Sequence, residues 1–177
     1  MRQVVLLRGI NLGARNRVAM PALREQLSEA GFTGARTYLS SGNVVLDSEA
    51  APEVLAREVE RLITGRFGLD IDVVVRSRDE LAAVVKLNPL GAVAVDPKRY
   101  QVSFMSAELD AGIVAEFEAL ATESEQIVAI GRELYAWHPD GVARSKLCAR
   151  LAGRKLGVTV TARNWTTVTS LVTMADG

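Results

Sequence analysis

Cysteine and histidine are almost absent from this sequence. Its 177 residues include one cysteine, Cys148, and one histidine, His138. One cysteine cannot form an intramolecular disulfide, and the usual zinc sites need several cysteine or histidine ligands. We therefore predict no metal and no other cofactor. Catalysis by a Ser-His-Asp or Cys-His group is also disfavoured, because His138 lies beside a turn proline and Cys148 is expected on the apolar face of a helix.

Long apolar runs are missing as well. No segment approaches the length of a membrane-spanning helix, and the amino-terminal residues do not form a signal-peptide core followed by a cleavage site. We therefore expect no membrane contact and a reduced, cytoplasmic location.

The chain has no overall excess of either charge. Its 21 lysine and arginine residues balance 21 aspartate and glutamate residues, whereas a general nucleic-acid coat would be more basic. The charges are nevertheless unevenly distributed, since Met1–Arg24 and Gly141–Ala175 contain basic residues and no acid, and the acidic residues between Arg99 and Arg132 stand without a basic one. The two basic segments form one positive face if they meet in space, and are separately hydrated otherwise.

The opening stretch Leu6-Leu7-Arg8-Gly9-Ile10-Asn11-Leu12-Gly13-Ala14-Arg15-Asn16-Arg17 is the most informative part of the sequence. The apolar residues Val4–Leu7 predict a buried strand, and Met20-Pro21 predicts a helix start. Glycines expose backbone N–H groups, arginines suit phosphate or carboxylate, and a helix start carries partial positive charge. The stretch can thus form an anion cradle. It contains neither GxGxxG nor GxxxxGK[ST], so a surface turn with solvated arginines is the alternative.

The element order predicts an α+β fold. Strands are expected at 4–7, 36–39, 44–47 and 71–75, with a helix between Met20 and Gly31 and another beginning at Pro52. Strand, helix, strand, strand, helix, strand is the ferredoxin-like βαββαβ order, a mostly antiparallel sheet with two helices on one face.

A boundary is expected at Asn88-Pro89-Leu90-Gly91, which follows a predicted helix at 78–87. It divides the chain into subdomains 1–90 and 91–177. The second subdomain repeats the element order, with strands at 100–105, 126–130, 133–137 and 158–161 and helices around 113–121, 147–152 and 164–171. No residue-level repeat accompanies this likeness.

Several motifs resemble a known family. Leu6–Asn11 with Gly13, Asn16 and Met20, then Gly31-Phe32, Thr37-Tyr38 and Ser41–Val45, and finally Arg163-Asn164-Trp165 with Thr167-Val168, are similar to the bacterial family called domain of unknown function 1697. The resemblance runs from Leu6 to about Val168. It departs at Ala14, where the family often has glycine, and at Thr166, where it often has asparagine. It implies two packed α+β subdomains and no particular activity.

Three functions are compatible with these features. The first is a binding module for a phosphorylated small molecule or for nucleic-acid phosphates, in a monomer or homodimer. The second is a small hydrolase of phosphate esters or acyl phosphates, by fold analogy. The third is a protein-interaction domain. The candidate ligand-binding residues are Arg8, Gly9, Asn11, Gly13, Asn16, Arg17, Asn43, Arg163 and Asn164.

Some of these features have simpler structural explanations. Asn43 suits a left-handed turn, and Asn164 suits a helix N-cap. Lys146, Arg150 and Arg154 are spaced as a helical stripe, which is either a solvated face or a phosphate contact beside a stacking Trp137. Base stacking on the first sheet is disfavoured, because residues 4–7 and 44–46 contain no aromatic side chain.

Overall fold

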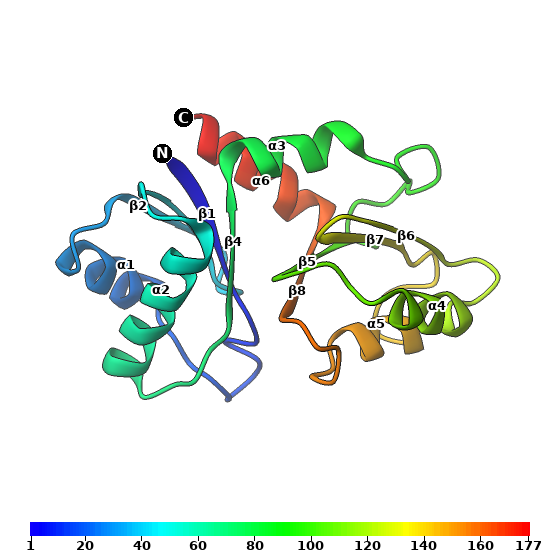
Figure 1. The fold of residues 1–177 in the computed structure, drawn as a ribbon, viewed down its shortest axis with the longest axis horizontal. Coiled ribbons are helices and arrows are strands. Elements are labelled where there is room, and N and C mark those ends of the chain that lie inside the picture. Colours follow the sequence, from blue (N-terminus) through cyan, green and yellow to red (C-terminus); the bar gives the residue numbers. More distant parts are fainter. The chain divides into compact units, whose positions relative to one another are not determined.

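The structure is a computed structural model that describes residues 1–177 (Figure 1). The chain forms two compact units, each with one four-stranded sheet. The first unit contains Met1–Ala83 and Leu171–Gly177, and the second contains Val84–Ser170. The α+β class with two subdomains is confirmed. No helix is both long and apolar enough to span a bilayer.

Strands and helices alternate along both units. The strands are β1 (Arg2–Leu7), β2 (Thr33–Tyr38), β3 (Asn43–Asp47), β4 (Val73–Ser77), β5 (Tyr100–Met105), β6 (Gln126–Ile130), β7 (Glu133–Trp137) and β8 (Val160–Asn164). The helices are α1 (Met20–Glu29), α2 (Pro52–Phe67), α3 (Arg78–Leu87), α4 (Ala111–Leu120), α5 (Lys146–Leu151) and α6 (Trp165–Asp176).

The first sheet has the strand order β2-β3-β1-β4, and each neighbouring pair is antiparallel. Side chains alternate between the two faces of a strand, so Val5, Leu7, Val44, Leu46 and Val75 share one face. That face packs with Leu23 and Leu27 of α1 and Leu55, Val59 and Ile63 of α2 in one buried cluster. Both helices lie on this side of the sheet (Figure 1). The predicted βαββαβ arrangement therefore follows from the apolar spacing.

The second sheet repeats this topology with the order β6-β7-β5-β8. Met105, Leu134 and Val160 form a core with Phe117 of α4 and Leu147 of α5. The two sheets also carry an arginine at equivalent positions of their last strands. Arg76 is the fourth residue of β4 opposite Val4, and Arg163 is the fourth residue of β8 opposite Val102. Both arginines are buried, a correspondence that spacing in the sequence did not reveal.

Element ends follow local chemistry. Pro21 and Pro52 stand in the first turns of α1 and α2, and Gly68 ends α2 with a left-handed φ of 66°. Asp110 caps α4 by accepting a hydrogen bond from the Gly112 N–H at 2.8 Å. Asn164 accepts one from the Thr167 N–H at 2.9 Å, which confirms the predicted N-cap of α6.

Several boundaries differ from the sequence expectation. β2 spans Thr33–Tyr38 rather than 36–39, and β8 spans Val160–Asn164 rather than 158–161. β4 begins at Val73 rather than at 71, which places Arg76 within the strand. The units divide inside α3, between Ala83 and Val84, rather than at residue 90, and the last seven residues return to the first unit. There Arg78 Nε donates to Asp176 Oδ1 at 2.6 Å. The Asn88-Pro89 pair marks the end of a helix, because proline disfavours a helical residue before it. A compact unit is instead defined by contacts between residues distant in sequence.

Truncating Leu27 tests the first core. Leu27 is fully buried, so Leu27→Ala should lower the free energy of unfolding by about 2–5 kcal/mol through a cavity and lost burial. The adjacent Ser28 is exposed, and Ser28→Ala should change stability by less than about 0.5 kcal/mol. Urea unfolding followed by circular dichroism measures both, and equal effects would contradict the packing of α1 described above.

Candidate functional site

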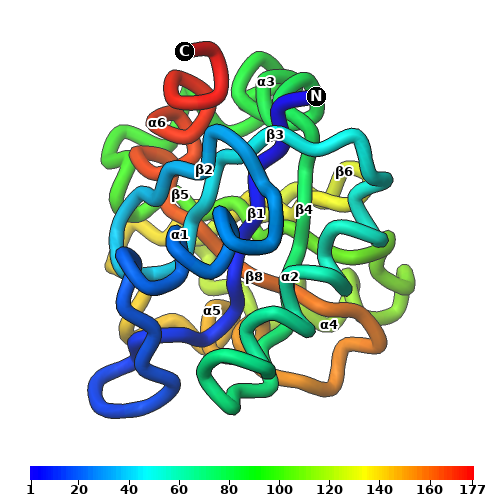
Figure 2. The backbone as a smooth tube through the Cα atoms, turned by 90° about the vertical axis from the view of Figure 1, so that its left-hand side faces the viewer, coloured from blue at the N-terminus to red at the C-terminus, as the bar shows by residue number.

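The loop between β1 and α1 is held in an unusual backbone conformation. Four residues have positive φ angles: Gly9 at 66°, Asn11 at 52°, Gly13 at 61° and Asn16 at 49°. Glycine and asparagine are the residue types that adopt this left-handed region at least cost. The glycines and asparagines of the opening stretch are therefore explained first by backbone geometry. The loop projects beyond the end of β1 at the lower left of Figure 2.

Asn11 holds the loop together. Its Nδ2 donates to the carbonyl oxygens of Val18 at 2.9 Å and Ser40 at 2.7 Å, while its Oδ1 accepts from the Val18 N–H at 2.9 Å. Asn16 adds a bond from Nδ2 to the Gly9 carbonyl at 2.9 Å, and its own carbonyl accepts from the Asn11 N–H. These amide groups are occupied in positioning the backbone.

The Ser41-Gly42-Asn43 turn lies against this loop. The Leu7 N–H donates to the Gly42 carbonyl at 2.8 Å. A Cβ on Gly42 would lie 2.7 Å from both Leu7 Cβ and Ile10 Cδ1, at a φ of 87°. Asn43 is opposite Leu6 in the sheet, and its Nδ2 donates to the Tyr38 carbonyl at 2.7 Å and to Ser41 Oγ at 3.0 Å. Asn43 therefore lies at the β1 end that carries Arg8 and stabilises the turn.

The arginines of the loop differ in their surroundings. Arg8 is mostly buried, and its Nη1 lies 3.3 Å from Asp72 Oδ2. Arg17 is exposed and donates from Nη1 to the Gly13 carbonyl at 2.9 Å. Arg15 is exposed, and neither Arg15 nor Arg17 forms an ion pair. Arg15 belongs to the stretch predicted to form an anion cradle, although it was not among the candidate ligand-binding residues named from the sequence.

The beginning of α1 adds to the positive character of the loop. Its N-cap residue, Ala19, provides no side-chain hydrogen bond, and its first turn contains no acidic residue. Amide groups at such a helix start remain available to an anion. The loop, held by the hydrogen bonds of Asn11 and Asn16, and the helix start together form a cationic tip.

Arg163 and Asn164 belong to the second unit, whereas the other predicted residues belong to the first. Arg163 is buried, its Nη1 donates to Thr161 Oγ1 and to the Ala162 carbonyl, both at 2.8 Å, and burial lowers the pKa of Arg163 to about 10. Asn164 caps α6. These two residues therefore have structural contacts of their own within the second unit.

Residues 1–135 match the family described as protein of unknown function (DUF1697). The chain belongs to this family. The matched residues include the opening loop and the Ser41-Gly42-Asn43 turn, which are in contact in the structure. The segment Arg163-Asn164-Trp165, which also resembled the family in sequence, lies beyond the matched residues.

A solved structure is similar to this chain over almost its whole length. It is the conserved bacterial protein SP0830 from Streptococcus pneumoniae, with a TM-score of 0.78 and 22% sequence identity over 98% of each chain. This similarity confirms the fold. No curated protein matches the chain.

A buried polar cluster in the second unit was missed by the sequence analysis. His138 Nδ1 lies 2.5 Å from Glu125 Oε2, and Ser145 Oγ donates to the same oxygen at 2.6 Å. Ser145 contacts the carboxylate rather than the imidazole, so the three residues lack the order of a catalytic triad. His138 is 1% exposed and its Nε2 has no partner. Two sequence features could have indicated this cluster: His138 directly follows a buried strand, and Ser145 directly precedes a helix.

The carboxylate is the charged centre of this cluster. Burial alone raises the pKa of Glu125, but hydrogen bonds from Ser145 and His138 outweigh it and bring the pKa below its ordinary value. Cys148 is only half-buried, and burial and the Glu125 charge both raise its pKa. A raised pKa disfavours the thiolate, so Cys148 is a poor nucleophile.

The predicted basic stripe does not form. α5 ends at Leu151, so Arg154 is not on the helix with Lys146 and Arg150. Arg150 instead pairs with Glu116 at 2.7 Å. Trp137 is 7% exposed and cannot serve as an open stacking surface. No group of three or more His, Cys, Asp or Glu side chains is arranged to hold a metal ion.

Replacing Asn11 tests whether its hydrogen bonds to Val18 and Ser40, here called the loop brace, hold the loop. Asn11→Gly keeps access to positive φ but removes three hydrogen bonds, so it should lower stability by about 1–3 kcal/mol and abolish hydrogen-exchange protection of the Val18 amide. Asn11→Ala should cost more, since alanine also resists a φ of 52°. Retained protection at Val18 in both variants would contradict the brace.

Acid titration tests the buried carboxylate. Because the pKa of Glu125 is lower in the folded state, its contribution to stability is complete above the unfolded value of about 4.3 and is lost as the pH falls through the folded value. Thermal unfolding of Glu125→Gln should therefore depend less steeply on pH below about 4.3 than that of the wild type. Glu118→Gln, an exposed carboxylate on α4, is the control. If the stability of the wild type and of Glu125→Gln depended on pH in the same way below about 4.3, this assignment would be wrong.

Proposed function

We propose that the protein binds a phosphorylated small molecule at the tip of the loop between β1 and α1. Arg15 and Arg17 contact the phosphate, and the backbone amides at Gly13, Ala14 and the start of α1 complete the site. The observation that carries this proposal is a braced loop presenting two exposed arginines, neither of which has a carboxylate partner.

The brace supports binding because it reduces the entropy lost when a ligand arrives. Asn11 links the loop to Val18 near its end and to Ser40 in the neighbouring turn, so the arginine-bearing segment does not have to become ordered first. Asn16 and Arg17 Nη1 close the loop internally through Gly9 and Gly13. In this arrangement Asn11, Asn16 and Asn43 are positioning residues, and Arg8 is held by Asp72.

A compact phosphate fits the charge better than a nucleic-acid backbone does. Strong nucleic-acid binding uses many phosphate contacts and an extended basic surface. The loop tip offers two arginines, and the net charge of the chain is zero. A phosphorylated small molecule is therefore the preferred class.

Ligand-dependent thermal unfolding tests the proposal. Inorganic phosphate, nucleotides, sugar phosphates and short RNA and DNA should be compared at low salt. A ligand at one hundred times its dissociation constant should add about 2.7 kcal/mol of stability. The shift should be lost in Arg15→Ala and Arg17→Ala, and retained in Arg57→Ala, which removes an exposed arginine of α2.

The alternative outcomes are distinct. Stabilisation by oligonucleotides alone, with a steep salt dependence, would replace the small molecule by nucleic acid. Stabilisation that survives in both loop variants would exclude the loop tip. No stabilisation by any phosphate compound would refute the proposal.

A further inference from the structure

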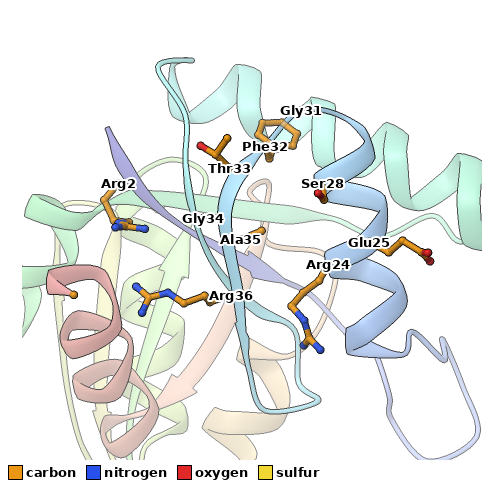
Figure 3. A pocket seen from close by; sticks show the side chains of 11 residues that line it. Arg2, Arg24, Glu25, Ser28, Gly31, Phe32, Thr33, Gly34, Ala35 and Arg36 are labelled. Carbon is orange, nitrogen blue, oxygen red and sulfur yellow. The ribbon is translucent and has the colours of Figure 1, made fainter.

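A second charged surface follows the free edge of the first sheet. β2 pairs only with β3, so no strand of the sheet covers its other side. A groove of about 810 Å³ lies along this edge, lined by Arg24 and Ser28 of α1 and by residues 31–36 (Figure 3). A strand edge beside a helix is a geometry that accepts an added peptide strand.

Arginines flank β2 on both of its faces. Thr37 is opposite Val44, whose side chain faces the helices, and Arg24 donates to Thr37 Oγ1. Arg36, the residue before Thr37, therefore points to the other face, where it donates to the Met174 carbonyl. Figure 3 shows Arg24 and Arg36 extending to opposite sides of the strand.

Three arginines, one glutamate and the last residue, Gly177, line the groove. Neither Arg24 nor Arg36 pairs with a carboxylate. The lining acid, Glu25, lies 3.1 Å from Arg66, and Arg2 lies 3.5 Å from Asp47. An occupant that supplies carboxylates would complement Arg24 and Arg36.

We infer that β2 binds an extended acidic segment of a partner protein, added to the sheet as an edge strand. Neighbouring side chains of a strand point to opposite faces, so two adjacent acidic residues reach Arg24 on one face and Arg36 on the other. This inference is independent of the phosphate site at the loop tip.

Two comparisons within the chain support an acidic partner. Pairing of β2 with β2 of a second copy would bring like charges together, which disfavours self-association through this edge. The equivalent edge strand of the second unit, β6, contains no basic residue, and α4 beside it in sequence carries Glu116 and Glu118. The arginines thus distinguish the β2 edge from a sheet edge in general.

The bulge in β2 limits where the added strand can pair. The register shifts between Thr33 and Arg36, and Gly34 has a φ of 64°. Bulges at edges restrict promiscuous pairing. Regular pairing is therefore expected beside Arg36–Tyr38, with the rest of the segment held in the groove by side-chain contacts.

Fluorescence anisotropy with short capped peptides tests this inference on the full chain. The probe has two adjacent glutamates between valine and threonine residues, and a matched probe has glutamines instead. The acidic probe should bind, and Arg24→Gln and Arg36→Gln should each weaken binding about three- to fivefold, as exposed ion pairs do. Arg57→Gln and Arg15→Ala should leave binding unchanged.

Backbone pairing has its own control. An acidic probe with N-methylated amides on alternate residues keeps its charge but cannot pair with β2, and should bind much more weakly. NMR shifts on adding the unmodified probe should fall on residues 33–38 and not on β6. Equal binding of the glutamine or N-methylated probe, displacement by equimolar inorganic phosphate, or unchanged binding in Arg36→Gln would each overturn the inference.

Discussion

The side-chain amide of Asn11 is the contact on which the proposed phosphate site depends. Three hydrogen bonds connect it to Val18 at the end of the loop and to Ser40 before β3. The loop would otherwise have to retain four left-handed residues without support, at a conformational cost that only surrounding structure can offset. Arg15 and Arg17 therefore extend from a loop that Asn11 holds through three hydrogen bonds.

The same region explains why the opening loop and the Ser41-Gly42-Asn43 turn, although separated in sequence, lie together. The Ser41-Gly42-Asn43 turn lies against the opening loop, and any side chain at Gly42 would clash with Leu7 and Ile10. Asn43 is opposite Leu6, so the antiparallel register brings the turn to the end of β1. The contact between the loop and the turn follows from the sheet register.

The two units use one topology with different surfaces. Both sheets place their first and third strands at the centre, and both carry a buried arginine at the fourth position of the last strand. The edges differ, since α1 and β2 present arginines and β6 does not. The basic sheet edge therefore belongs to the first unit and has no counterpart on β6.

Apolar periodicity in the sequence determined the element order and the helix-bearing face of each sheet, because burial acts through neighbouring residues. The N-cap at Asn164 followed from the residue type at the start of a helix. The asparagine-rich loop was also identifiable, although its amides position the backbone. Only the tertiary structure decided that Arg8 pairs with Asp72, that Arg15 is exposed without a partner, and that Glu125 joins His138 and Ser145. Those contacts link residues far apart in the chain, and local spacing contains no information about which distant charge lies nearby.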